Sequence, residues 1–181
     1  SFGVTKQWFG MTRRAFGFTS LGLLFLLLAG YTKQLAVFTA AAVFGYLFLL
    51  DPKRCMVLVV AFGAVFGLIF FGLNQATDGQ WWLNTIAANV NAYQVPQLVA
   101  LTRSWLKVHI VFLVLAMGYV LYELYIDRLS VYSLWFAFAI GTGLMSGKWG
   151  AGEAYWVTAV AAALVLSGFA LGKLRDWIQH Q

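Results

Sequence analysis

Charged residues are scarce in this sequence. Only 10% of its 181 residues are Asp, Glu, Lys or Arg, whereas 62% are hydrophobic and the mean hydropathy is +0.80. Soluble domains carry about 25% charged residues, so this chain has too few charges to cover a surface that faces water. The composition excludes an ordinary soluble domain and predicts a helical protein embedded in a membrane.

Cysteine and the common catalytic motifs are also nearly absent. The single cysteine, Cys55, excludes an internal disulfide and a CxxC metal site, and we expect it to pack at a helix start. The sequence has no Walker loop, dinucleotide fingerprint, HExxH motif, nucleophile elbow or carboxylate pair. No second His or Cys gives His109 the spacing of a metal ligand, so we predict no metal site, and no cofactor is evident. The residues alone indicate no reaction.

Long apolar blocks occupy most of the chain. A hydrocarbon core about 30 Å thick is crossed by about 20 residues of helix, so we expect an all-α polytopic membrane protein of about six transmembrane helices in a single unit. A tight turn at Lys33 and Gln34 separates the first two blocks. Pro52 is placed to open the third helix. The expected spans are 15–32, 35–50, 55–73, 105–122, 129–146 and 154–172, with an outer loop over 74–104.

A polar interval, residues 74–104, lies between the third and fourth blocks. Its large apolar residues recur on one face of a helix, namely Trp82, Ile86, Val90 and Tyr93. We expect an interfacial helix here, capped by Asp78 and ended at Pro96. This helix is either a connecting aromatic belt or one wall of a site, and its periodicity leaves both open. In the third block, Gly63 and Gly67 predict a close helix approach.

The basic residues indicate an orientation. Lys and Arg accumulate at the cytoplasmic ends of spans. With six spans, eight of the twelve basic residues fall on the side of both termini, and four fall on the other side. We therefore predict a multi-pass protein of the cell inner (plasma) membrane with both termini in the cytoplasm. The net charge of +6 has the same explanation, and no basic stripe interleaved with exposed aromatics indicates nucleic-acid binding.

The predicted outer face carries the remaining cations and many amides, which suit phosphate and hydroxyl groups. Arg103 and Lys107 are spaced i, i+4 on a helix; they either hold a lipid phosphate or simply extend to the headgroup layer. Lys33 lies in a two-residue gap between spans and is either a plain polar turn or a phosphate ligand. His109 has a structural explanation as an interfacial residue, and Glu153 has one as an acid near a helix N-terminus.

Three stretches, in this order, resemble the C-terminal half of the polytopic C-superfamily (GT-C) glycosyltransferases. They are Gly-Tyr-Thr-Lys-Gln at 30–34, Trp82 followed by Asn-Val-Asn-Ala-Tyr at 89–93, and Gly-Lys-Trp-Gly-Ala at 147–151 followed by Tyr155 and Trp156. The resemblance covers residues 30–173. It implies a sugar donor that is a polyprenyl phosphate. Because the chain begins at Ser1 in an aromatic-rich stretch, we expect it to be the C-terminal part of a longer protein.

The resemblance also implies roles for individual residues. Lys33 would offset phosphate charge on the donor, and Lys148 would approach the same pocket. Gln34, Asn89 and Asn91 would hold sugar hydroxyls or phosphate oxygens. With the two cations discussed above, the predicted substrate-binding residues are Lys33, Gln34, Asn89, Asn91, Arg103, Lys107 and Lys148.

The catalytic acid of the resembled family lies in its N-terminal half, so no residue of this chain is assigned that role. Ala154 and Thr158 stand where the family commonly carries Asn and Glu.

Two functions follow from these patterns. The first is a glycosyltransferase that moves a sugar from a polyprenyl-phosphate donor on the extracytoplasmic face. The second is a non-catalytic accessory subunit that packs in a larger membrane complex, with membrane lipids and other membrane subunits as partners. A transporter fits less well, because no span has a centre broken by Gly or Pro and flanked by polar groups.

Overall fold

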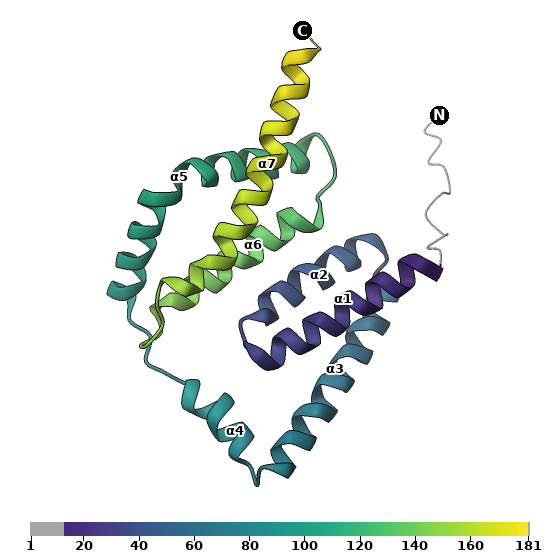
Figure 1. Cartoon of the computed structure of the whole chain (residues 1–181), viewed down its shortest axis with the longest axis vertical. Coiled ribbons are helices and arrows are strands. Elements are labelled where there is room, and N and C mark those ends of the chain that lie inside the picture. The colour runs from purple at the N-terminus through teal and green to yellow at the C-terminus, as the bar shows by residue number, and fades with distance from the viewer. Residues whose placement is uncertain (1–12, 181) are drawn as a thin grey trace.

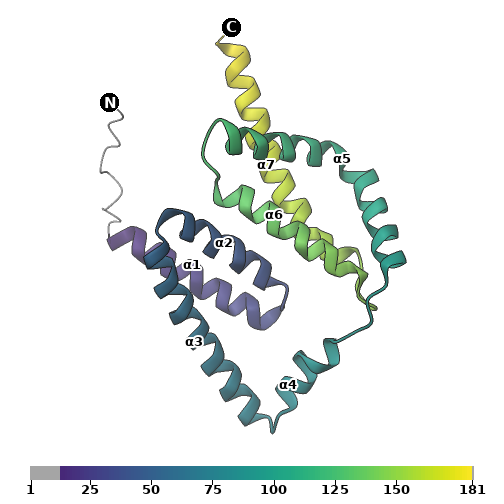
Figure 2. The same cartoon turned by 180° about the vertical axis from the view of Figure 1, so that it is seen from behind.

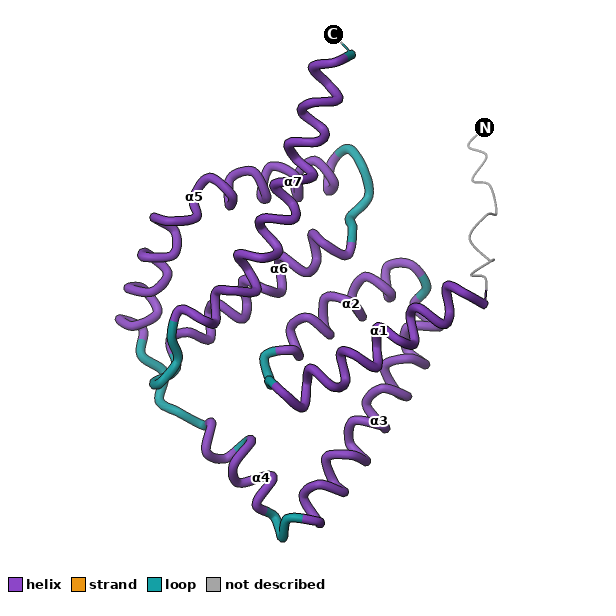
Figure 3. Tube along the Cα trace, in the orientation of Figure 1, coloured by secondary structure: helices purple, strands orange, loops and turns teal. Residues whose placement is uncertain are grey.

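The computed structural model describes residues 13–180, and within that range the protein is built of helices and turns (Figures 1 and 3). The helices are α1 (Arg13–Thr32), α2 (Ala36–Leu50), α3 (Pro52–Ala76), α4 (Gln80–Thr85), α5 (Val95–Tyr125), α6 (Val131–Leu144) and α7 (Val157–Gln179). Short 3-10 turns occur at Ala87–Asn89, Met145–Gly147 and Glu153–Trp156. The all-α prediction is confirmed.

Three helical segments are long and apolar enough to cross a membrane: Pro52–Ala76, Val95–Tyr125 and Glu153–Gln179. Shorter apolar helices occupy Gly17–Thr32, Ala36–Leu50 and Val131–Gly147. On α3, the side chains of Val57, Val60 and Leu68 are 66–72% exposed, which suits contact with lipid. These helices indicate a membrane protein. Each expected span overlaps one of the six apolar helices, but six crossings stay a prediction.

The start of α3 forms as the sequence predicts. Pro52 occupies the first turn, where the missing N–H costs nothing. The Asp51 carboxylate accepts a hydrogen bond from the Arg54 amide at 3.1 Å and caps the helix. Cys55 is buried, and its Sγ lies 3.2 Å from the Phe44 carbonyl oxygen of α2. The expectation that Cys55 packs at a helix start is confirmed.

Helix α5 begins at Val95, ten residues before the expected start of the fourth span. We expected Pro96 to end an interfacial helix, but it lies in the first turn of α5. The 31 residues of α5 extend over about 46 Å at 1.5 Å per residue, and the helix bends around α7 (Figures 1 and 2). The outer loop expected over 74–104 therefore shrinks to the segment between α3 and α5.

The interfacial helix expected in this loop is also shorter than its periodicity suggested. α4 ends at Thr85, and a 3-10 turn follows. The Asn89 Nδ2 donates to the Thr85 carbonyl at 2.9 Å and to the Asn84 carbonyl at 3.4 Å, which satisfies two carbonyls at the helix end. Val90 and Tyr93 therefore do not continue the helical face.

Asp78 does not cap α4. It adopts a left-handed backbone conformation, with φ of +49°. The amides at the start of α4 are instead satisfied from the end of α3. The Thr77 hydroxyl accepts from the Trp81 amide at 3.0 Å, and the Asn74 side chain accepts from the Trp82 amide at 2.9 Å.

The hydrophobic core lies among α5, α6 and α7. Ala159, Ala162, Ala163 and Leu166 form one buried face of α7, and Phe136 of α6 and Ala116 of α5 pack against it. Small side chains on α7 let its neighbours approach closely. On its other side α6 packs on α2, which in turn contacts α1 and α3.

The closest approaches at glycine are not the expected ones. The space beside Gly63 and Gly67 of α3 is open within the described part of the chain. The close helix approach predicted there is wrong for contacts among these residues. Instead, a Cβ at Gly141 would lie 2.8 Å from the Phe38 ring, and one at Gly143 would lie 2.3 Å from the Trp156 ring. Glycine is needed where α6 meets α2 and the start of α7.

Candidate functional site

A pocket of about 430 Å³ lies where the α1–α2 turn, α4 and the α6–α7 connection meet. It brings together residues that are far apart in the sequence. Its polar lining consists of Thr32, Lys33, Gln34, Asn84, Thr85, Asn89 and Lys148, together with the aromatic residues Tyr31 and Tyr155. Among the described residues that line the pocket, none is acidic. The lining favours an anionic ligand.

Lys33 is exposed and lies beside an aromatic ring. Its Nζ is 5.9 Å from the centroid of the Tyr155 ring, within the range of a cation–π contact. Tyr155 comes from the 3-10 turn that leads into α7. This contact directs the ammonium toward the α6–α7 side of the pocket while leaving its three N–H donors for other partners.

Lys148 enters the pocket from the α6–α7 connection. Its Nζ donates to the Asn89 carbonyl at 2.6 Å, which fixes the ammonium beside the 3-10 turn that follows α4. An ammonium has three donors, so this hydrogen bond leaves capacity for a phosphate oxygen. Lys33 and Lys148 therefore place two positive charges on one pocket.

The amide side chains around the pocket also hold its walls together. The Gln34 Nε2 donates to the Thr85 carbonyl, which ties the α1–α2 turn to α4. Asn89 binds the same carbonyl through its Nδ2. With these nitrogens used as donors, the amide oxygens remain the groups suited to accept from sugar hydroxyls. Asn91 lies outside the lining, and its Nδ2 donates to the Trp149 carbonyl at 3.2 Å.

Residues 92–97 pair with the α6–α7 connection, and this pairing positions Lys148. Tyr93 and Lys148 form an antiparallel bridge. The Gln94 amide donates to the Gly147 carbonyl at 2.7 Å, and the Trp149 amide donates to the Ala92 carbonyl at 2.8 Å. The wall that carries Lys148 is thus fixed by backbone hydrogen bonds between segments distant in the chain.

Gln97 completes this pairing from the first turns of α5. Its Nε2 donates to the carbonyls of Ser146, Lys148 and Ala151 at 2.7, 2.9 and 3.0 Å. The two N–H groups of this amide nitrogen are shared among the three carbonyls, and a side chain without a donor could bind none of them.

Gln97→Glu is expected to loosen the α6–α7 connection, because a carboxylate cannot donate and would lie against three carbonyl oxygens. The loss of a buried partner costs about 1–3 kcal/mol, and more for a charged group. Hydrogen exchange at the Trp149 and Ala151 amides should rise at least tenfold. Gln94→Glu is the matched control, since the Gln94 side chain is exposed. Equal protection in the two variants would contradict this role for Gln97.

An apolar cavity of about 360 Å³ adjoins the polar pocket. It lies among α1, α2 and α3, where Leu26, Ala40, Phe62 and Phe66 are part of its lining. Gln34 and Val37 line both spaces. The two together offer a cationic compartment next to a hydrocarbon compartment.

Like Asn91, two other predicted site residues lie outside the polar pocket. Arg103 and Lys107 are exposed on α5 and do not line the polar pocket. His109 and Glu153 line a different, smaller pocket of about 270 Å³. In the described range, no three His, Cys, Asp or Glu side chains gather as metal ligands would.

Sequence reasoning missed Tyr155, Thr85 and Asn84 as pocket residues. Tyr155 follows the Gly-Lys-Trp-Gly-Ala stretch at 147–151, and its place in the turn before the last helix was the available signal. Thr85 and Asn84 join the lining because α4 ends there, which its apolar periodicity did not indicate.

Comparison with protein-family models, with curated proteins and with solved structures finds no match to this chain.

Proposed function

We propose that this protein binds the phosphate of a polyprenyl-phosphate sugar between Lys33 and Lys148 and serves the transfer of that sugar. The observation that supports this function is the pair of ammonium groups in one pocket whose described lining holds no acid. In such a transfer the lipid phosphate is the leaving group. Fixed cations stabilise the negative charge that it gains in the transition state.

The adjoining apolar cavity supports a lipid donor over a water-soluble sugar phosphate. Binding sites for small molecules combine apolar walls with a few placed polar groups. Here the apolar walls come from α1, α2 and α3, and Gln34 marks the boundary with the cationic pocket. The isoprenoid chain would lie in the apolar cavity, and the sugar would face Asn89 and Asn84.

The same proposal includes an orientation. The end of the helices that carries Lys33 and Lys148 would face the extracytoplasmic side of the plasma membrane, with six crossings and cytoplasmic termini. The positive-inside rule supports this orientation, because most of the basic residues belong to the opposite end. No residue of this chain is assigned as the catalytic acid.

A second candidate function is that of an accessory subunit in a membrane complex. One observation favours it: Gly63 and Gly67 lie one helical turn apart on α3 with open space beside both. Small residues at this spacing let a second helix approach closely in a membrane. In this case the polar residues of the pocket would only connect the helices and would bind no substrate.

Binding of undecaprenyl phosphate and of uncharged undecaprenol to the purified chain in lipid nanodiscs separates these functions. A hydrogen bond to a charged group contributes about 1.5–3 kcal/mol, and each 1.4 kcal/mol is about tenfold in affinity. We expect undecaprenyl phosphate to bind at least tenfold more tightly. Lys148→Ala should reduce this preference, and Lys53→Ala, an exposed lysine of the other end, should not. Equal binding of phosphate and alcohol would favour the accessory subunit.

A further inference from the structure

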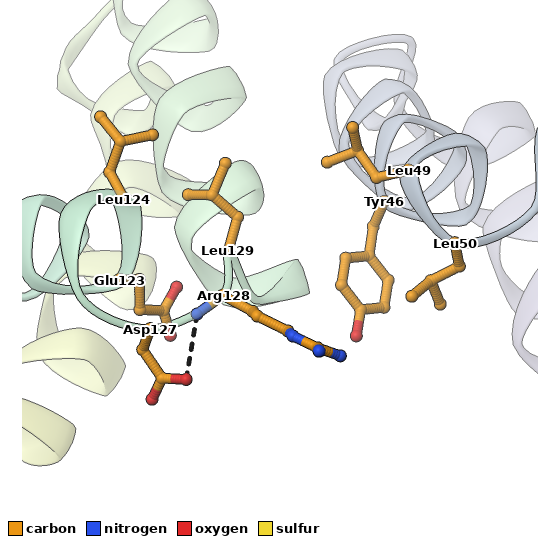
Figure 4. Close-up of a pocket in the computed structure, with 8 residues that line it drawn as sticks. All are labelled: Tyr46, Leu49, Leu50, Glu123, Leu124, Asp127, Arg128 and Leu129. Carbon is orange, nitrogen blue, oxygen red and sulfur yellow. Dashed lines mark hydrogen bonds between the residues drawn. The ribbon is translucent and has the colours of Figure 1, made fainter. Parts of the chain in front are cut away.

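A second pocket, of about 600 Å³, lies at the other end of α2. It is lined by the end of α2 and by the connection between α5 and α6 (Figure 4). The 15 residues of α2 separate it from the candidate site by about 22 Å at 1.5 Å per residue. Its volume falls in the range of about 300–1,000 Å³ that is usual for small-molecule sites.

The acidic side of this pocket is formed by Glu123 and Asp127. Glu123 is only 4% exposed, and its Oε2 accepts a hydrogen bond from the Ser130 amide at 2.8 Å. The Asp127 Oδ1 accepts from the Arg128 amide at 3.0 Å. Each carboxylate has about four lone-pair sites, so one hydrogen bond leaves both able to accept from a further donor.

The basic side of the pocket is formed by Arg128. Its side chain extends away from the two carboxylates and toward the Tyr46 hydroxyl of α2 (Figure 4). The guanidinium and the phenol offer donors to a phosphate in the same region. Positive and negative groups are therefore separated along the polar edge of one pocket.

The charged groups of the lining are two carboxylates and one guanidinium. Outside the lining, Lys173 of α7 lies 5.3 Å from the Tyr122 ring centroid. A simple anion would meet two carboxylates, and a simple cation would meet Arg128. A ligand that carries a phosphate and an ammonium a few bonds apart matches both sides.

The remaining walls are aliphatic. Leu49, Leu50, Leu124 and Leu129 line the pocket beside its charged edge. Leu49, Leu50 and Leu124 are 44–60% exposed, which suits contact with acyl chains. The pocket also lies at helix ends, next to the basic turn of residues 51–54. Charged edge, aliphatic walls and helix-end position together fit the headgroup region of a phospholipid.

We propose that this pocket binds one phospholipid whose headgroup ends in a primary ammonium, the chemistry of phosphatidylethanolamine. The phosphate lies on Arg128 and Tyr46, and the ammonium donates to Asp127 and Glu123. A choline headgroup has no N–H and cannot make the second set of hydrogen bonds. A glycerol headgroup lacks the positive charge that the two carboxylates select.

Lipid binding to the whole chain tests this site. The chain in detergent is titrated with phosphatidylethanolamine, phosphatidylcholine and phosphatidylglycerol of identical acyl chains, and bound lipid is counted by native mass spectrometry. We expect about a tenfold preference for phosphatidylethanolamine, the ratio that one charge-assisted hydrogen bond provides. Asp127→Asn should reduce the preference over phosphatidylcholine, because only phosphatidylethanolamine loses a hydrogen bond in this variant. Arg128→Ala should weaken both lipids.

Matched variants keep the outcome interpretable. Asp176→Asn removes an exposed carboxylate of α7 that pairs with Arg175 outside the pocket, and it should change nothing. Lys33→Ala should also leave the preference for phosphatidylethanolamine intact. A negative result for this phospholipid pocket is therefore distinct from a negative result for polyprenyl-phosphate binding. For Glu123→Gln the unfolding midpoint is measured together with lipid binding, because this carboxylate also accepts a hydrogen bond from the Ser130 amide at the start of α6.

Three results would overturn the proposal. The first is equal binding of the three lipids. The second is an unchanged preference in Asp127→Asn. The third is competition by soluble phosphoethanolamine at the affinity of the lipid itself, which would make the ligand a free zwitterion and leave the aliphatic walls without a role.

Discussion

Replacing Lys33 by alanine is expected to lower sugar transfer from a polyprenyl-phosphate donor by about 10²–10³-fold, the usual cost of removing one group that stabilises transition-state charge. The ammonium of Lys33 lies at the pocket beside Tyr155, and no acid of the described lining would compete for it. Transfer is measured in membranes from cells that produce the protein, with a panel of radiolabelled polyprenyl-phosphate sugars.

The control variants for this experiment alter either Lys33 itself or a lysine at the opposite end of the helices. Lys53→Ala removes an exposed lysine from the other end and should retain transfer. Lys33→Arg keeps the charge and should recover part of the activity, although a guanidinium differs in shape from an ammonium. Lys33→Ala should remain in the membrane fraction at the level of the unaltered protein. Undiminished transfer in Lys33→Ala would refute its role at the phosphate.

Replacing Gly143 by alanine is expected to destabilise the protein by about 3 kcal/mol, at the upper end of the usual cost of overpacking. A Cβ at this position would lie 2.3, 2.4 and 2.6 Å from three atoms of the Trp156 ring. The ring has little room to move. It is 3% exposed, it stacks on Trp105 at 4.3 Å between centroids, and its Nε1 donates to the Ser146 hydroxyl at 3.2 Å.

Chemical unfolding in detergent, followed by tryptophan fluorescence, measures this effect. Gly168→Ala is the matched control, because it lies within α7 with no atom within 4 Å of the added methyl group. Alanine is favoured over glycine in a helix interior by about 1 kcal/mol, so this variant should be slightly more stable. Similar unfolding midpoints for the two variants would show that the α6–Trp156 contact is not tight.

The same contact affects the candidate site. Trp156 follows Tyr155, whose carbonyl accepts a hydrogen bond from the buried Thr142 hydroxyl at 3.0 Å. A shift of the tryptophan would displace Tyr155, and with it the ring beside Lys33. Gly143→Ala should therefore weaken undecaprenyl phosphate binding as well as stability, although Gly143 does not line the pocket.

Much of the helical architecture follows from local sequence. Long apolar blocks fold as helices because a membrane leaves backbone groups no other partner. The turn at Lys33 and the helix start at Pro52 were predicted because each depends on residues only a few positions apart. The burial of Cys55 followed from its place at a helix start.

Only the tertiary structure decided how the connections are built. α4 ends at Thr85 and α5 begins at Val95 because Asn89, Tyr93 and Gln97 find partners at the helix end and in the α6–α7 connection. Apolar periodicity reports which residues share a helical face, and it carries no information on such distant partners. Arg103 and Lys107 fell outside the pocket for the same reason.

The sequence by itself determined a helical chain suited to a membrane, with cations and amides gathered in its polar connections. The tertiary structure decided which of them meet: Lys33 with Lys148 at one end of α2, and Tyr46 with Arg128 at the other. The physical reason is that a helix is fixed by hydrogen bonds four residues apart. A pocket depends instead on how whole helices pack, and here the small side chains of α6 and α7 set that packing.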